Sequence, residues 1–202
     1  MARSKEDHEA IATAIRHAEQ RTCGQIVCVL ARASSNYTYI PVLWATALAL
    51  LVPWPVIVFT AWSVQRIFAV QLAVFIVAAL ALSLRPLRMA LVPRSVRRAR
   101  AHHAALEQFV VRRVAHTRNR SGVLIFVSLA ERYARVIADE GVAHKAGQAD
   151  WQAAVDVLVG HFREGRIAAG LIAAIERCGA LLAAHAPPDG SPNALPDRLY
   201  VM

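Results

Sequence analysis

Two long stretches without a charged residue constrain this sequence more than any other feature. They run from Tyr39 to Trp62 and from Ile67 to Leu84, 24 and 18 residues respectively. As helices they would be about 36 Å and 27 Å long, close to the ~30 Å hydrocarbon core of a bilayer. Only Ser63 to Arg66 separate them. The sequence therefore predicts a transmembrane helical hairpin, with a kink at Pro53-Trp54-Pro55.

Two alternatives to a membrane hairpin fit the sequence less well. A secretory signal begins near the N-terminus, whereas a 38-residue polar stretch comes first here. A buried hairpin in a soluble protein needs a very large core, because helices that are apolar all round must be covered on every side. A chain of 202 residues, 56% hydrophobic and 18% charged, does not supply such a core.

The basic residues are concentrated in one segment directly after the second apolar stretch. The net charge is +9, and residues 85–120 hold ten arginines against the single acidic residue Glu107. This placement is typical of a membrane-proximal segment and not of a nucleic-acid-binding face. The positive-inside rule places both termini in the cytoplasm. The proposed contacts to anionic lipid headgroups are Arg94, Arg97, Arg98 and Arg100.

The polar parts of the chain read as one α/β domain that the hairpin interrupts. Helical patterns at 6–21, 92–118, 148–163 and 166–185 alternate with strand-like runs at 25–31, 122–128 and 133–138, and a short extended segment is expected at 199–202. Neither polar part alone has enough strands for a stable sheet. The prediction is a two-layer α/β domain. Its parts are residues 1–38 and 92–186, with the hairpin within 39–90 and a C-terminal tail at 187–202.

The order of these elements and several local motifs resemble the TPM-domain family. The similar segments are residues 14–19, Thr22-Cys23-Gly24-Gln25-Ile26, the strand at 121–128 and the segment Gly165 to Leu171. In its hairpin the chain is similar to the membrane-anchored bacterial branch of the family. The resemblance thus implies a TPM-like fold in the cytoplasmic membrane of a bacterium. Some family members are described as acid phosphatases or as calcium-binding, and others act as accessory factors of membrane complexes.

Three carboxylates form the candidate metal site. Glu131, Asp139 and Glu140 flank the strand-like run at 133–138, and clustered carboxylates on loops suit calcium or magnesium. A solvated acidic edge with a turn at Asp139-Glu140-Gly141 explains the same residues. Many relatives have a glycine-rich turn followed by an aspartate at this point, so the sequence departs from the family where that chemistry would lie.

Two functions remain open. No P-loop, GxGxxG, GxSxG or HExxH motif is present, and Cys23, Cys28 and Cys178 form neither a disulfide framework nor a zinc pattern. The favoured function is a non-catalytic accessory or scaffold factor that binds a membrane protein partner. The alternative is a metal-dependent, acid-phosphatase-like enzyme that uses the three carboxylates.

Overall fold

The computed structural model describes residues 5–35, 39–84, 87, 91–117, 119–190 and 195–202. Its backbone contacts divide the chain into two compact units. One unit combines Met1–Ser34 with Arg100–Met202 and is mixed α/β; the other, Ser35–Ala99, is helical. The α/β unit is therefore built from two segments that are far apart in the sequence.

The α/β unit contains a four-stranded sheet in the order β3-β2-β1-β4. Its strands are β1 (Gln25–Ala31), β2 (Gly122–Ser128), β3 (Tyr133–Ala138) and β4 (Leu199–Val201). Strand β1 pairs in parallel with β2 and β4, and β2 pairs antiparallel with β3. The three longer strands have the bounds that the sequence predicts, and the expected extended segment at the C-terminus is confirmed as β4.

Apart from Gln25 and Ser128 at their ends, the two central strands have no polar side chain, because both faces of the sheet are covered. In β1, Ile26, Cys28 and Leu30 belong to the hydrophobic cluster on one face. Val27 and Val29 belong to the cluster on the other face. Successive side chains of a strand point to opposite faces, so a strand buried on both sides has no polar alternation.

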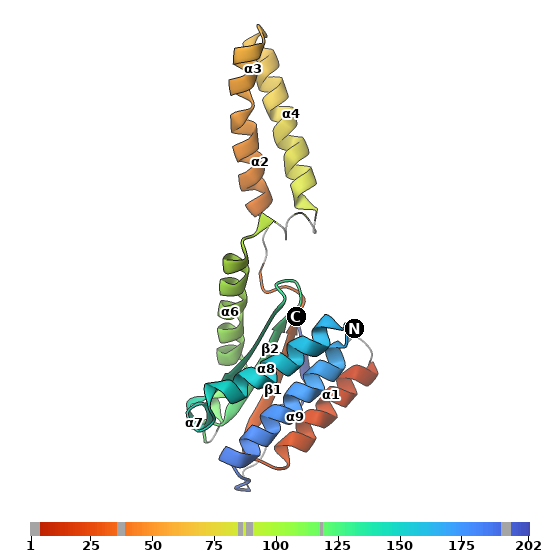
Figure 1. The fold of residues 1–202 in the computed structure, drawn as a ribbon, viewed down its shortest axis with the longest axis vertical. Helices are drawn as coiled ribbons and strands as arrows, with labels where there is room; N and C mark the ends of the chain where they lie inside the picture. Colours follow the sequence, from red (N-terminus) through yellow and green to blue (C-terminus); the bar gives the residue numbers. More distant parts are fainter. Residues whose placement is uncertain (1–4, 36–38, 85–86, 88–90, 118, 191–194) are drawn as a thin grey trace. The chain divides into compact units, whose positions relative to one another are not determined.

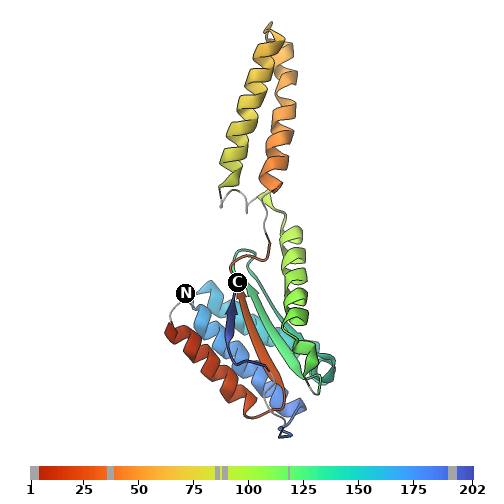
Figure 2. The same cartoon turned by 180° about the vertical axis from the view of Figure 1, so that it is seen from behind.

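Helices lie on both faces of this sheet, so the expected two-layer arrangement is wrong. One face is covered by α1 (Lys5–Glu19), α8 (Gln148–Arg163) and α9 (Ile167–His185), as Figure 1 shows. The other face is covered by α6 (Arg94–Val111) through its second half, which places Ala105 against the sheet. Figure 2 shows α6 on this side. The sequence predicts only one layer of helices, because the small alanines of α6 do not indicate which face of the sheet they cover.

The helical unit is a hairpin of α2 (Tyr39–Leu51), α3 (Pro53–Phe59) and α4 (Val64–Ser83). The kink expected at Pro53-Trp54-Pro55 coincides with the boundary between α2, which ends at Leu51, and α3, which begins with Pro53. The chain reverses over residues 60–63 and not over 63–66 as predicted. Ser63 is the N-cap of α4, with extended backbone angles, and the Arg66 N–H donates to its carbonyl at 3.0 Å. Arg66 therefore lies in the first turn of α4.

Two further differences from the sequence prediction lie in the α/β unit. Helix α6 ends at Val111 instead of Arg118, because Arg113 adopts the left-handed conformation (φ 54°) that terminates helices. A short 3₁₀ turn, Val114–His116, follows. The four-residue helix α7 (Glu140–Ala143) was not expected; Asp139 caps it by accepting a hydrogen bond from the Glu140 N–H.

Candidate functional site

The three candidate metal ligands lie at opposite ends of β3. Glu131 precedes the strand, whereas Asp139 and Glu140 follow it. Six residues of extended chain span about 20 Å, which is far beyond the reach of one cation's ligands. The described residues contain no group of three His, Cys, Asp or Glu side chains that could hold a metal ion. The structure therefore does not assemble Glu131, Asp139 and Glu140 into the calcium or magnesium site that the sequence suggested.

Glu131 has a structural environment of its own in the turn between β2 and β3. It is buried, and both of its carboxylate oxygens accept from the Ser34 backbone N–H, at 3.0 and 3.1 Å. The Ser128 hydroxyl donates to the same carboxylate. These two donors to the Glu131 carboxylate therefore both belong to the α/β unit. Glu131 thus joins the end of β2 to Ser34, three residues after the end of β1.

Asp139 and Glu140 lie together but in different environments. Asp139 is buried; its Oδ1 accepts from the Glu140 N–H at 2.8 Å, and its Oδ2 has no hydrogen-bond partner among the described residues. The Glu140 carboxylate is exposed and forms an ion pair with Arg120. A Cβ atom on Gly141 would lie 2.2 Å from the Asn119 carbonyl oxygen. This turn is therefore held tightly against the segment that leads into β2.

The four candidate lipid-binding arginines all lie in the first two turns of α6. At 100° per residue, Arg94, Arg97 and Arg98 share an arc of about 100°, and Arg100 lies roughly 60° beyond Arg97. Arg94 and Arg98 are exposed, whereas Arg97 and Arg100 are half-buried. The structure thus gathers three of the four on one face of the helix. Three other arginines of the basic segment, Arg85, Arg88 and Arg118, lie outside the described residues.

The thiols in the core of the α/β unit are unsuited to catalysis. Cys28 on β1 and Cys178 on α9 are fully buried. Burial raises the pKa of Cys178 to about 12. Burial, together with Cys178 and Glu19, raises the pKa of Cys28 as well. The thiolate is the reactive form of cysteine, and a raised pKa leaves little of it near neutral pH, so these two cysteines serve as core residues. Cys23 is more accessible than either of them.

Sequence reasoning missed three arginine contacts on the α6 side of the sheet. The guanidinium of Arg112 lies 3.8 Å from the centroid of the Tyr200 ring, and that of Arg198 lies 4.8 Å from it. The Arg135 guanidinium donates to Nδ1 of His102 at 2.8 Å. The His102 contact joins α6 to β3, and the Arg112 contact joins the residue just after α6 to β4. No local pattern indicates these two contacts, because their partners meet only once the sheet has formed.

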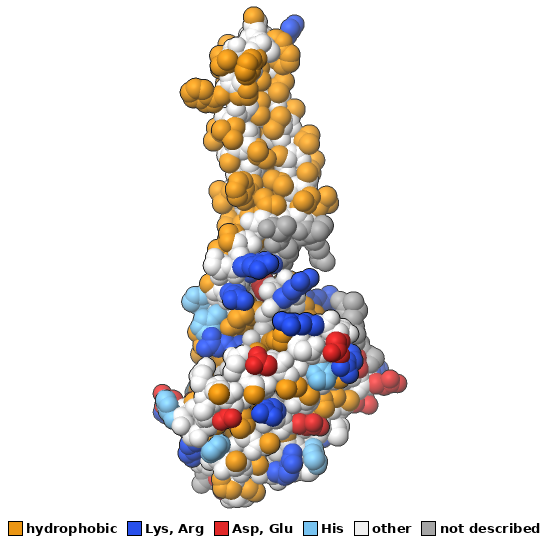
Figure 3. Space-filling view, viewed as in Figure 1, with side chains coloured by type: hydrophobic (Ala, Val, Ile, Leu, Met, Phe, Trp, Pro, Cys, Tyr) orange, Lys and Arg blue, Asp and Glu red, His pale blue; other side chains and the backbone are white. Residues whose placement is uncertain are grey.

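The hairpin unit has an outer surface unlike that of the α/β unit. Large side chains of α3 point outward, among them Trp54, Val58 and Phe59, which are 75%, 71% and 83% exposed. Figure 3 shows hydrophobic side chains over the visible face of the hairpin, and a mixture of acidic, basic and histidine side chains over that of the α/β unit. By length and composition three described helical segments are apolar enough to cross a membrane: Tyr39–Phe59, Val64–Ser83 and Ile167–His185.

Comparison with known proteins identifies the family. A family model described as the TPM domain matches residues 69–181, which is more than half of the chain. The chain belongs to the TPM-domain family. The match begins within α4 and ends within α9, so it includes α6 and strands β2 and β3.

A solved structure supports the fold of this TPM-domain protein. The NMR structure of the BA42 protein from the psychrophilic bacterium Bizionia argentinensis matches with a TM-score of 0.61 and 18% sequence identity. The match covers 98% of this chain and 94% of that one. At this identity the likeness concerns the fold alone. Comparison with curated proteins gives no match.

Proposed function

We propose that this TPM-domain protein is anchored in the cytoplasmic membrane of a bacterium by the α2–α4 hairpin and acts there as a non-catalytic accessory or scaffold factor. The observation that carries the proposal is the outward-facing apolar surface of the hairpin. In α4, Phe68, Val77 and Leu80 are between 65% and 68% exposed. Such a surface is unfavourable in water and suits hydrocarbon. The lengths of the hairpin segments also suit a bilayer.

Helix α9 provides an internal comparison, because it is also long and apolar enough to span a membrane. Its most hydrophobic 18-residue window is 39% buried, against 11% and 6% for the two hairpin segments. Leu171, Ile175 and Leu182 are fully buried against the sheet and the neighbouring helices. Composition alone therefore does not separate a core helix from a membrane span, whereas burial does. On this basis α9 is a core helix of the TPM domain, and among the described helices we assign the bilayer span to the hairpin.

The charge distribution supports a cytoplasmic location for both termini. The reversal between α3 and α4 is flanked by the single basic residue Arg66, whereas the basic segment follows α4. Short loops rich in arginine stay on the cytoplasmic side. Arg94, Arg97 and Arg98 then face anionic lipid headgroups, and each contributes on the order of 1 kcal/mol near a charged membrane surface.

The accessory role follows from what the TPM domain offers as a surface. The described residues assemble no cluster of metal ligands, and the two core thiols are buried. A compact domain fixed beside a membrane can present its surface to a membrane protein partner without chemistry of its own. Proximity labelling from the N-terminus in native membranes tests this role. Reproducible labelling of one membrane complex supports it, and a labelling pattern equal to that of an unrelated anchored protein counts against it.

Carbonate extraction and cysteine accessibility test the membrane anchor. The full chain should remain in the membrane pellet, and a Ser63→Cys variant should react with an impermeant maleimide added outside intact cells. Native Cys23 should react only after the cells are permeabilised. Recovery of the chain in the supernatant would contradict the anchor. Labelling of Cys23 from outside would contradict the sidedness.

The lipid contact is tested with the full chain in nanodiscs. Hydrogen exchange in the first turns of α6 should slow when zwitterionic lipid is replaced by phosphatidylglycerol, and added salt should reverse the change. Arg94→Gln with Arg98→Gln should abolish the difference. Arg163→Gln with Arg177→Gln, at exposed positions of α8 and α9, is the matched control and should preserve it. Equal exchange in both lipids would remove the lipid contact.

The enzymatic alternative depends on Asp139 and Glu140 without Glu131. The buried Asp139 Oδ2, which has no hydrogen-bond partner among the described residues, is the observation in its favour. The test is calcium or magnesium titration of the full chain, with hydrolysis of a generic phosphomonoester as the readout. Activity that Asp139→Asn removes would establish the enzyme. No turnover, together with unchanged thermal stability on adding either metal, would end this alternative.

A further inference from the structure

We propose that two copies of the chain associate within the bilayer through Gln71 of α4, whose side-chain amide pairs with the same amide of the second copy. The inference rests on the proposed function, because it requires the hairpin to lie in lipid. Gln71 lies seven residues into α4 and five residues beyond Arg66, within the uncharged stretch that follows. An uncharged amide at such a position needs a hydrogen-bond partner, because hydrocarbon supplies none.

Three hydroxyl side chains of the hairpin each donate a hydrogen bond to the carbonyl four residues earlier. The Thr46 hydroxyl donates to the Val42 carbonyl at 2.9 Å, and the Ser83 hydroxyl donates to the Ala79 carbonyl at 2.6 Å. The Thr60 hydroxyl, just after α3, also donates to the carbonyl four residues earlier. A primary amide carries two donors and an acceptor. Within the described part of the chain the Gln71 amide makes no such bond.

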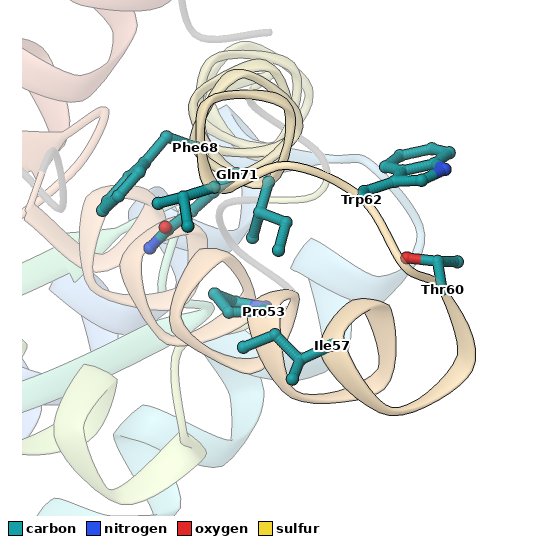
Figure 4. A pocket seen from close by; sticks show the side chains of 8 residues that line it. Pro53, Ile57, Thr60, Trp62, Phe68 and Gln71 are labelled. Atoms are coloured by element: carbon teal, nitrogen blue, oxygen red, sulfur yellow. The ribbon is translucent and has the colours of Figure 1, made fainter.

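The Gln71 side chain lines a hollow at the end of the hairpin where the chain reverses direction. The hollow lies between α3 and α4, and Figure 4 shows Gln71 of α4 on one side of it and Pro53 and Ile57 of α3 on the other. The remaining lining residues are Thr60, Trp62, Val64 and Ile67. Most of the lining is apolar, and the Gln71 amide is its longest polar side chain. A partner that enters from the lipid side therefore meets the Gln71 amide in a largely apolar setting.

A second copy is the occupant that this chemistry suits best. An amide is self-complementary, because the N–H of each copy can donate to the C=O of the other. In two copies related by a two-fold axis, each Gln71 amide therefore donates one hydrogen bond to the other and accepts one from it. Hydroxyl groups already bonded to their own helix offer no comparable contact. Apolar side chains beside Gln71, such as Phe68 at 65% exposure, supply the surrounding packing that helix association in lipid requires.

Energy transfer between labelled copies tests the proposal. Full chains carrying donor or acceptor dyes at the N-terminus are reconstituted into phosphatidylcholine–phosphatidylglycerol vesicles over a range of protein-to-lipid ratios. Gln71→Leu should raise the dissociation constant of the pair roughly 3- to 20-fold, the range expected for interhelical hydrogen bonds in membranes. Gln71→Asn, which keeps an amide, should recover part of the loss. The matched control is Gln65→Leu, the same exchange in the first turn of α4, and it should leave the constant unchanged.

Carbonate extraction of the same samples separates this inference from the membrane anchor. An anchored chain that stays monomeric at all densities overturns the pairing but leaves the anchor intact. So does a Gln71→Leu variant that associates as well as the native chain, since the amide is then satisfied within one copy or by water. A Gln71→Asn variant no better than Gln71→Leu also overturns it. A chain recovered in the supernatant overturns both proposals together.

Discussion

The Glu131 carboxylate receives the Ser34 backbone N–H on both of its oxygens, at 3.0 and 3.1 Å, although 97 positions separate the two residues in the sequence. Ser34 is the last residue of the α/β unit before the segment that contains the hairpin. The contact therefore fixes the point at which the chain leaves the sheet. A carboxylate that was a candidate metal ligand in the sequence is a structural group in the fold.

Removal of this carboxylate should destabilise the TPM domain. Glu131→Ala leaves the Ser34 N–H and the Ser128 hydroxyl without their acceptor in a buried place, and hydrogen bonds to charged groups contribute about 1.5–3 kcal/mol. Glu131→Gln keeps one acceptor and should cost less. Thermal unfolding of the full chain in detergent measures both. Glu107→Ala, at an exposed position on α6, is the control and should change the free energy of unfolding by less than about 0.5 kcal/mol.

Two glycines, the first residue of β2 and one in α7 that packs against the segment leading into β2, should not tolerate a methyl group. A Cβ atom on Gly122 would lie 2.2 Å from the Val114 carbonyl oxygen, and one on Gly141 would lie equally close to that of Asn119. Backbone atoms cannot move aside without shifting β2, so each alanine substitution should destabilise the domain by roughly 3 kcal/mol.

The control for the glycine substitutions is Gly160→Ala on α8. A Cβ atom there meets nothing within 4 Å, and alanine in a helix interior is favoured over glycine by roughly 0.5–1 kcal/mol. This variant should therefore be more stable than the native chain. Chemical denaturation of the four proteins gives the order. Equal midpoints for Gly122→Ala and Gly160→Ala would contradict the close approach at β2.

The strands could be predicted from the sequence because the hydrophobic pattern that indicates each strand lies within the strand itself. The run Val123 to Val127 is apolar without alternation, which indicates a strand covered on both faces. The third layer could not be predicted in the same way. Helix α6 covers the sheet with small residues such as Ala105, and small residues carry little periodic signal. Its end at Val111 depends on the left-handed backbone angles of Arg113. Such angles favour glycine or asparagine, so an arginine at this position gives no sequence signal for the helix end.

The candidate site illustrates a different limit of sequence reasoning. Glu131 and Asp139 are eight positions apart and flank one strand, so their placement at its two ends follows from the sequence. Their separation follows only when the run at 133–138 is treated as extended, which gives about 20 Å and not one shared site. The partner of Glu131 could not be predicted, because Ser34 belongs to the first polar part of the chain.

The buried thiols should be unreactive in the folded protein. Because burial raises the pKa of Cys178 to about 12 and raises that of Cys28 also, the thiolate population near neutral pH is negligible at both. Iodoacetamide should modify Cys23 first, and the other two only after unfolding. Mass spectrometry of peptides from native and urea-treated protein measures this. Modification of Cys178 in the native chain at a rate similar to that of Cys23 would show that α9 opens readily.

The contact between α6 and β3 should weaken in acid. Burial lowers the pKa of His102 from its usual 6.5, and the neighbouring Arg135 and His103 lower it further. An arginine can only donate, so Nδ1 of His102 must accept the Arg135 bond at 2.8 Å as a neutral ring. Below pH 6.5 the unfolded chain takes up a proton at His102 before the folded chain does. The stability linked to this group is therefore present above about pH 6.5 and is lost as the pH falls through the folded-state pKa.

A proton NMR titration of the His102 ring in the full chain tests this dependence. Arg135→Gln removes the neighbouring charge, so the pKa of His102 should rise toward its usual value, and the domain should lose less stability between pH 8 and pH 5. Arg177→Gln, an exposed arginine on α9, is the matched control and should leave the titration unchanged. If His102 titrates identically in the native chain and in Arg135→Gln, the guanidinium does not lower the pKa of the His102 ring. In that case the apolar contacts alone hold α6 to β3.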